Sequence, residues 1–191
     1  MQIRFVAPPW GAPRLTNESR ELVALLGDGV WSEASLSFYA ERDAKVRAGR
    51  RAPKGMQKTL NSVISRRFLE AGWEGDSGYF FKNQTWVRIT FRHQMSLGSD
   101  IVDALKVCKK EGMQLAVILA ASFSTLQLIS PNDCSALISF EKLQNEVANL
   151  DGVIDIPLVI GELSPASVVP SSIEDELRKS RPRDTTIPNN T

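Results

Sequence analysis

A run of basic side chains with no acid among them is the sequence feature with the clearest chemical meaning. It extends from Lys45 to Arg67 and holds eight basic residues. These are Lys45, Arg47, Arg50, Arg51, Lys54, Lys58, Arg66 and Arg67. The net charge of the chain is only +1, which by itself argues against a nucleic-acid binder. Clustering on this scale nevertheless predicts a positive surface of the kind that contacts phosphates.

A second group of polar side chains follows a predicted strand, TWVRITF, at residues 85–91. Its residues alternate between an apolar set and a polar, basic set: Val87, Ile89 and Phe91 against Arg88, Thr90 and Arg92. Strand side chains point alternately to opposite faces, so one face is predicted to be apolar and the other polar and basic. An arginine there can hold a phosphate through two parallel hydrogen bonds. His93 and Gln94 come next and are candidates for polar contacts with the same ligand.

The sequence offers little for other chemistry. His93 is the only histidine, and no Ser or Cys constellation makes it part of a catalytic triad. Cys108 and Cys134 have neither disulfide-framework nor zinc spacing, which predicts a reducing, cytoplasmic location and no metal site. We expect no cofactor, unless Mg²⁺ serves an active nuclease. No signal peptide and no membrane-spanning run are expected.

The elements that must position these side chains follow from periodicity and turn residues. Strands are predicted at residues 3–6, 78–81, 85–91, 114–121 and 154–163. Helices are predicted at residues 17–26, 32–46, 56–71, 99–111 and 140–150. The stretch at residues 121–135 is predicted to be a loop. This order indicates an α/β domain at residues 1–163, with a central mixed sheet flanked by helices. Residues 164–191 are predicted to be a polar tail.

Helix ends and buried faces are predicted in more detail. The first helix is capped by Thr16 or Asn17, and later helices by Ser32, Ser99 and Ser139. The third helix is predicted to bury Leu60, Val63, Ile64, Phe68 and Leu69. The tryptophans at positions 10, 31, 73 and 86 are interpreted as core or interface residues.

From Met56 to Leu163 the chain resembles type II restriction endonucleases that read GATC-centred sites and have the PD-(D/E)xK nuclease fold. The resemblance rests on an ordered set of pieces: LEAGW, TWVRITF, KKEGM, QLAVILA, FEKLQNEVANL and DIPLVIGEL. It implies a restriction-endonuclease-like core that contacts double-stranded DNA. The basic segment 45–67 stands where such enzymes carry a lysine-rich loop near DNA.

The resemblance also implies a catalytic site that this sequence does not reproduce. The family's central strand carries an acid, an apolar residue and then Gln or Lys, with a further acid about nine residues upstream. Here Arg88 stands at the strand acid, Thr90 at the Gln or Lys, and Tyr79 at the upstream acid. Two carboxylates are what would hold Mg²⁺ beside the scissile phosphate. Arginine inverts that charge, so we predict DNA contact and no confident catalytic residue.

The residues expected to contact DNA are ten polar or basic side chains. They are Lys45, Arg47, Arg50, Arg51, Lys54, Lys58, Arg88, Arg92, His93 and Gln94. Arg50 and Arg51 are the strongest candidates, because they lie at the break in the chain. A displaced metal site is an alternative, and its candidate acids are Glu70, Glu74 and Asp76.

Three functions remain open on the sequence. The first is a DNA-binding protein that has lost cleavage, acting as a homodimer or as a subunit of a bacterial restriction or defence assembly. The second is an active Mg²⁺-dependent type II endonuclease with a displaced site. The third is a protein-interaction module that reuses the nuclease fold.

Overall fold

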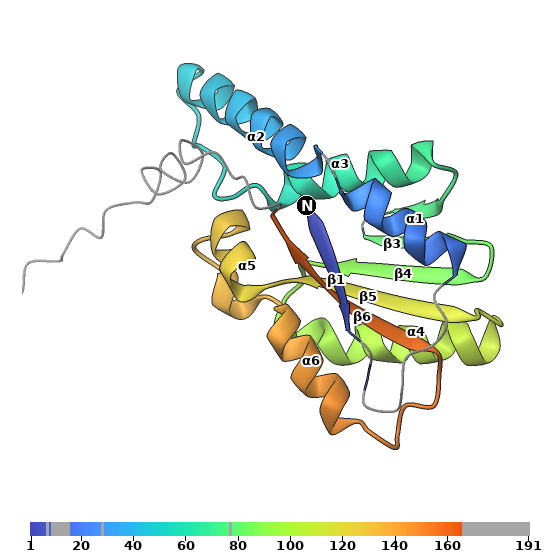
Figure 1. Ribbon diagram of the computed structural model, residues 1–191. Coiled ribbons are helices and arrows are strands. Elements are labelled where there is room, and N and C mark those ends of the chain that lie inside the picture. Colours follow the sequence, from blue (N-terminus) through green and yellow to red (C-terminus); the bar gives the residue numbers. More distant parts are fainter. Residues whose placement is uncertain (7, 9–15, 28, 77, 166–191) are drawn as a thin grey trace, which may run out of the picture.

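The computed structural model describes residues 1–6, 8, 16–27, 29–76 and 78–165. These residues form a single six-stranded sheet with helices on both faces (Figure 1). The strands are β1 (Gln2–Val6), β2 (Glu74–Asp76), β3 (Tyr79–Lys82), β4 (Thr85–Thr90), β5 (Leu115–Ala121) and β6 (Leu158–Ser164). The helices are α1 (Asn17–Leu26), α2 (Val30–Arg47), α3 (Gln57–Glu70), α4 (Leu97–Lys110), α5 (Phe123–Ile129) and α6 (Phe140–Asn149). Short 3₁₀ turns lie at Gln94–Ser96 and Cys134–Ala136.

The sheet is mixed, as predicted. Its order is β1-β6-β5-β4-β3-β2. Strands β4, β5 and β6 are parallel to one another. Strand β1 pairs antiparallel with β6 at one edge. At the other edge β3 pairs antiparallel with β4, and β2 pairs antiparallel with β3. The predicted α/β class with a central mixed sheet is therefore confirmed. Parallel strands require crossover helices, and α4 and α6 supply them.

Alternation along β5 explains how one sheet supports two cores. Every residue of β5 is buried. Val117 and Leu119 face the core beneath α1, α2 and α3, whereas Ile118 and Ala120 face the core beneath α4 and α6. A strand covered on both faces reads as a continuous apolar run, which is why LAVILAA shows no polar alternation.

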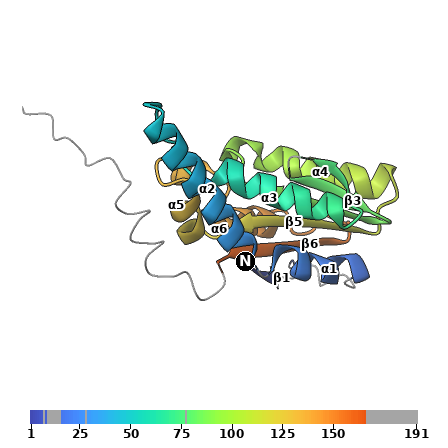
Figure 2. The ribbon, with the colours of Figure 1, turned by 90° about the horizontal axis from the view of Figure 1, so that it is seen from above.

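The two ribbon views show what lies at the carboxyl edge of the parallel strands. Helix α2 extends past the sheet on the side where α5 follows β5 (Figure 1, Figure 2). The segment that returns from α2 to α3 is anchored there by the Met56 N–H, which donates to the carbonyl of Ile129 at 2.8 Å. The basic break in the sequence therefore lies at the carboxyl edge. In open α/β sheets this edge is where ligands bind.

Several predicted helix boundaries were wrong. Helix α2 begins at Val30, with Gly29 (φ +80°) as its cap, so Ser32 lies inside the helix. Helix α4 continues directly from the 3₁₀ turn at 94–96, so Ser99 also lies inside a helix. The caps predicted at Thr16 and Ser139 are confirmed, since both side chains accept a backbone N–H in the first turn.

Two elements were missed. The predicted loop at 121–135 contains α5, capped by Ser122 and buried through Thr125, Leu126 and Ile129. A Ser- and Thr-rich composition concealed the helical spacing of that buried face. Strand β2 is only three residues long, too short to show alternation.

The predicted buried stripe of α3 is confirmed at four positions and wrong at one. Leu60, Val63, Ile64 and Phe68 are buried, whereas Leu69 is 52% exposed. Leu69 lies about 100° round the helix from Phe68, which turns it toward solvent.

Trp31, Trp73 and Trp86 are buried, as predicted. Trp10 and the predicted tail beyond Pro165 lie outside the described residues. No helix in the described part of the chain is long and apolar enough to cross a bilayer.

Candidate functional site

The three positions singled out by the resemblance do come together. Tyr79 of β3 is the direct cross-strand partner of Arg88 on β4, and Thr90 lies two residues further along the same face. Trp86 on that face packs edge-on against the Tyr79 ring, with centroids 6.0 Å apart. The face lies beneath α4, and Thr90 is fully buried. The polar and basic face predicted for this strand is therefore not open to solvent, because helix α4 covers it.

Arg88 is paired inside the protein. Its Nε donates to Oδ1 of Asp100 at 3.1 Å, and its side chain is only 13% exposed. Arg92 Nη1 donates to the same oxygen at 2.8 Å, with its side chain 43% exposed. Asp100 itself is fully buried in the first turn of α4. Its charge therefore balances part of the positive charge that two arginines place under the helix.

Asp100 is the residue of this cluster that sequence reasoning missed. It lies three residues after Leu97 and four before Ala104, on the apolar stripe of α4. An acid on a buried stripe is informative, because burial of a charge is costly unless the charge is paired. This spacing was the signal that could have found it.

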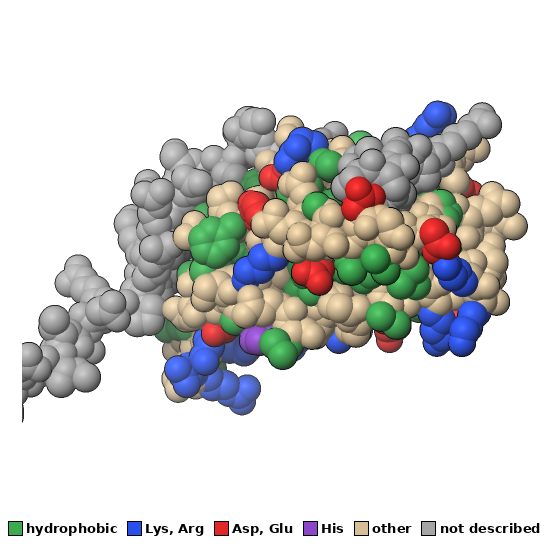
Figure 3. Space-filling view, turned by 90° about the horizontal axis from the view of Figure 1, so that it is seen from below, with side chains coloured by type: hydrophobic (Ala, Val, Ile, Leu, Met, Phe, Trp, Pro, Cys, Tyr) green, Lys and Arg blue, Asp and Glu red, His purple; other side chains and the backbone are tan. Residues whose placement is uncertain are grey.

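The chain leaves β4 as an exposed segment at the carboxyl edge of the sheet. Arg92, His93, Gln94 and Met95 are consecutive and exposed. His93 Nδ1 accepts the N–H of Met95 at 3.3 Å. Figure 3 shows Lys and Arg side chains gathered next to the histidine at one edge of the face seen from below.

Lys142 of α6 fixes the orientation of Gln94. Its Nζ donates to the Gln94 side-chain oxygen at 2.7 Å and also to the backbone carbonyls of Ser135 and Leu137. Because the oxygen of Gln94 is held, its amide NH₂ is turned to the other side as a donor.

A polar groove of about 700 Å³ lies between this edge and α3. It is lined by residues of the 53–55 segment, one face of α3, the end of β2 and the segment after α5. The lining residues are Pro53, Lys54, Gly55, Gln57, Lys58, Asn61, Ser62, Ser65, Asp76, Ser130 and Asp133. Gln57 joins the groove to the exposed segment, since its Nε2 donates to the carbonyl of Phe91 at 2.9 Å.

The wall of the groove depends on a glycine. A Cβ at Gly55 would overlap the carbonyl oxygen of Ile129, so only glycine allows the two backbones to approach this closely. The hydrogen bond from Met56 to the same carbonyl fixes the contact. Lys54 and Lys58 are thus presented from a braced wall, and both side chains are exposed.

The other basic residues of the run are placed differently. Lys45 pairs with Glu41 along α2 at 2.6 Å. Arg47, Arg50 and Arg51 are exposed at and beyond the end of α2. They lie outside the groove lining, although Arg50 and Arg51 belong to the segment that leads into it.

Arg66 and Arg67 do not add to that positive surface. Both arginines pair with Glu33 of α2, and Arg66 also pairs with Glu70. The Glu33 and Glu70 carboxylates raise the pKa of Arg66 further above its ordinary value. This network ties α2 to α3.

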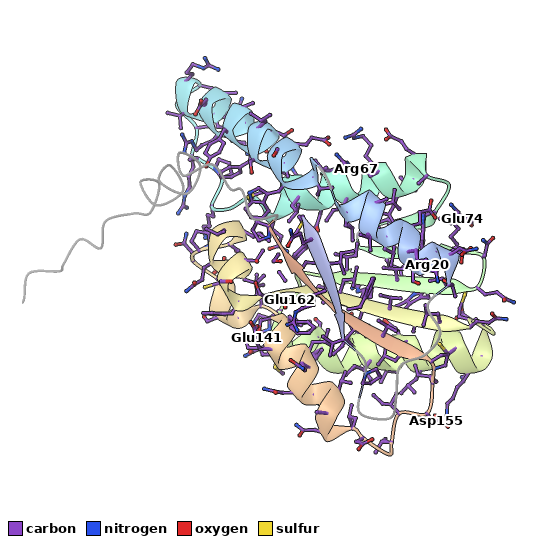
Figure 4. The ribbon with its side chains drawn as sticks, in the orientation of Figure 1. Arg20, Arg67, Glu74, Glu141, Asp155 and Glu162 are labelled. Atoms are coloured by element: carbon purple, nitrogen blue, oxygen red, sulfur yellow. The ribbon has the colours of Figure 1, made fainter. Side chains whose placement is uncertain are left out.

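The three acids proposed for a displaced metal site are not brought together. Glu70 pairs with Arg66 at 3.3 Å, and Glu74, labelled in Figure 4, lies on β2 and does not line the groove. Only Asp76 reaches the groove, where Asp133 is a second acid. In the described part of the chain no three His, Cys, Asp or Glu side chains are close enough to hold a metal ion.

Cys108 of α4 offers no activated nucleophile. Burial raises the pKa of the Cys108 thiol to about 11, which leaves the thiol neutral at ordinary pH. The groove therefore presents neutral hydrogen-bonding groups, the cations Lys54 and Lys58, and the acids Asp76 and Asp133.

Comparison with known proteins supports the fold. No protein-family model matches the chain, and no curated protein matches it. Among solved structures, the chain is similar to the restriction endonuclease BglII, crystallised in complex with a DNA 16-mer. The TM-score is 0.53 and the sequence identity 18%, over 87% of this chain and 79% of that chain. The likeness establishes a restriction-endonuclease-like fold.

Proposed function

We propose that this restriction-endonuclease-like protein binds duplex DNA along its polar groove and does not cleave it. The observation that carries the proposal is the position of Lys54 and Lys58. They line a groove at the carboxyl edge, next to the exposed segment that begins at Arg92. BglII, which has this fold, was crystallised with DNA.

Charge and shape both favour a phosphate backbone as ligand. Lys54 and Lys58 line the groove together with the acids Asp76 and Asp133, and the exposed Arg50 and Arg51 belong to the segment that leads into it. Asn61, Ser62 and Ser65 follow helical spacing along α3 and add neutral hydrogen-bonding groups to the same wall. Phosphate contacts of these kinds position a protein on a duplex.

The exposed segment after β4 is the proposed base-reading element. Gln94 and Met95 combine a carboxamide and an apolar tip, and these are groups that contact base edges in the major groove. Lys142 holds the orientation of Gln94 before any ligand binds. We further propose that the protein acts as a homodimer or as a subunit of a bacterial restriction or defence assembly.

Titration of the purified protein with a short duplex across a salt series tests DNA binding. We expect the logarithm of the binding constant to fall linearly with the logarithm of salt concentration, with a slope of about 0.9 for each phosphate contact. The mass of the complex, measured in the same samples, distinguishes one protomer from two. Absence of salt-sensitive binding would leave the protein-interaction alternative and contradict this proposal.

Addition of Mg²⁺ or Mn²⁺ to those samples tests the loss of cleavage. We expect the duplex to stay intact, because the resemblance matches Arg88 to the family's metal-binding acid, and Arg88 is paired with Asp100. We expect Asp76→Asn to bind DNA about threefold more tightly, since it removes an anion from the groove. If the wild type cleaves the duplex and Glu70→Ala or Asp76→Ala abolishes that cleavage, the protein is instead a nuclease with a displaced site.

A further inference from the structure

The cluster beneath α4 has an arrangement that burial alone does not explain. Both arginines share one oxygen of Asp100, Oδ1. The other oxygen, Oδ2, is buried and has no hydrogen-bond partner among the described residues. An unsatisfied buried oxygen costs free energy, so the pairing of both arginines with Oδ1 is not explained by burial alone.

The two arginines differ in what remains available to a ligand. Arg88 is almost enclosed, with its Nε bonded to Asp100. The Arg92 guanidinium is bonded within the described chain through Nη1 alone, and 43% of the side chain is exposed. Its remaining N–H donors therefore extend from an anchored guanidinium at the surface. The carbonyl of the preceding residue, Phe91, accepts a hydrogen bond from Gln57, which lines the groove.

We propose that Asp100 is a positioning residue that holds the Arg92 guanidinium at the carboxyl edge of the sheet, where it binds one phosphate of the DNA backbone. The proposal rests on the DNA binding proposed above. One Arg92 nitrogen is fixed to a buried acceptor, so less side-chain freedom is lost when a phosphate binds. The cluster keeps an excess of one positive charge, two arginines against one aspartate, which suits an anion.

The sign of the effect separates positioning from simple electrostatics. Removal of an acid from a protein that binds DNA normally strengthens binding, because the field of the protein becomes more positive. If Asp100 acts through Arg92, neutralisation of Asp100 weakens binding instead. Asp103 supplies the matched control, since it lies on the same helix and is exposed.

The experiment is a double-mutant cycle on the full chain, measured as affinity for a duplex across a salt series. We expect Arg92→Ala to lower affinity about tenfold and to reduce the salt slope by about 0.9, the value for one phosphate contact. We expect Asp100→Asn to lower affinity about three- to tenfold, and to have little further effect in the Arg92→Ala background. Asp103→Asn is expected to bind as tightly as the wild type or more tightly.

A second pair of variants keeps the test valid if Asp100→Asn does not fold. Arg88→Met/Asp100→Asn removes both buried charges and leaves Arg92 without its anchor, so affinity is expected to fall as it does for Asp100→Asn. Arg88→Met alone leaves Arg92 anchored, and affinity is expected to stay near that of the wild type. Thermal unfolding of each variant identifies the ones that are folded.

Two results would overturn the proposal while DNA binding stood. One is unchanged or tighter binding by folded variants that lack Asp100. The other is a loss on Asp100→Asn that persists in full in the Arg92→Ala background, which would make Asp100 merely structural. A wild-type protein with no salt-sensitive affinity for DNA would instead refute the proposed function, and the inference with it.

Discussion

A Lys54→Glu/Lys58→Glu variant is expected to bind duplex DNA about a hundredfold more weakly than the wild type at moderate salt. The two lysines project from the groove wall on either side of the start of α3. Each charge reversal removes an attraction and adds a repulsion toward the phosphates. The slope of the salt dependence is expected to fall by about 1.8, because two phosphate contacts are lost. Fluorescence anisotropy with a labelled duplex measures both quantities.

Lys106→Glu/Lys110→Glu is the matched control for that variant. It makes the same change in net charge on exposed residues of α4, toward the end of the helix that leads into the amino end of β5. We expect its affinity to fall only a few-fold, through the general field of the protein. Equal losses in the two variants would mean that net charge, and not the groove, governs binding.

The largest effect on stability is expected from Phe68→Ala. Phe68 is fully buried, and its ring lies 4.3 Å from Phe80 and 5.3 Å from Trp73 between centroids. Truncation of a buried aromatic side chain typically lowers the free energy of unfolding by about 3–5 kcal/mol. The loss would loosen α3, the helix that carries one wall of the groove. Urea unfolding followed by tryptophan fluorescence or circular dichroism measures the change.

Leu69→Ala tests the same helix at its exposed neighbour. Because Leu69 is 52% exposed, we expect a change in the free energy of unfolding of no more than about 0.5 kcal/mol. If Leu69→Ala is as unstable as Phe68→Ala, Leu69 is buried as predicted from the sequence, and the packing of α3 described above is contradicted.

Much of the fold was predictable because its signals are local. The continuous apolar run at β5 and the caps at Thr16 and Ser139 were read correctly from neighbouring residues. The missed elements are those whose signals are short or mixed. Strand β2 depends on its pairing with β3, and α5 combines polar composition with a three-residue buried face.

The basic run was predictable as a feature, but its members have different surroundings. Arg66 and Arg67 pair with Glu33, which is more than thirty residues away in the sequence. Lys54 and Lys58 instead line the groove. Charge along a chain shows that a positive surface is possible, whereas the partners of each cation depend on which elements pack together.

The sequence by itself determined the α/β class and the absence of acids at positions 79 and 88, since both depend on residue types along the chain. Only the tertiary structure decided what occupies that place. Helix α4 packs over β4 and buries Asp100 against Arg88 and Arg92, so the polar and basic strand face is a covered ion-pair cluster. The physical reason is that strand alternation assigns side chains to a face, but burial of that face depends on a helix from a later part of the chain.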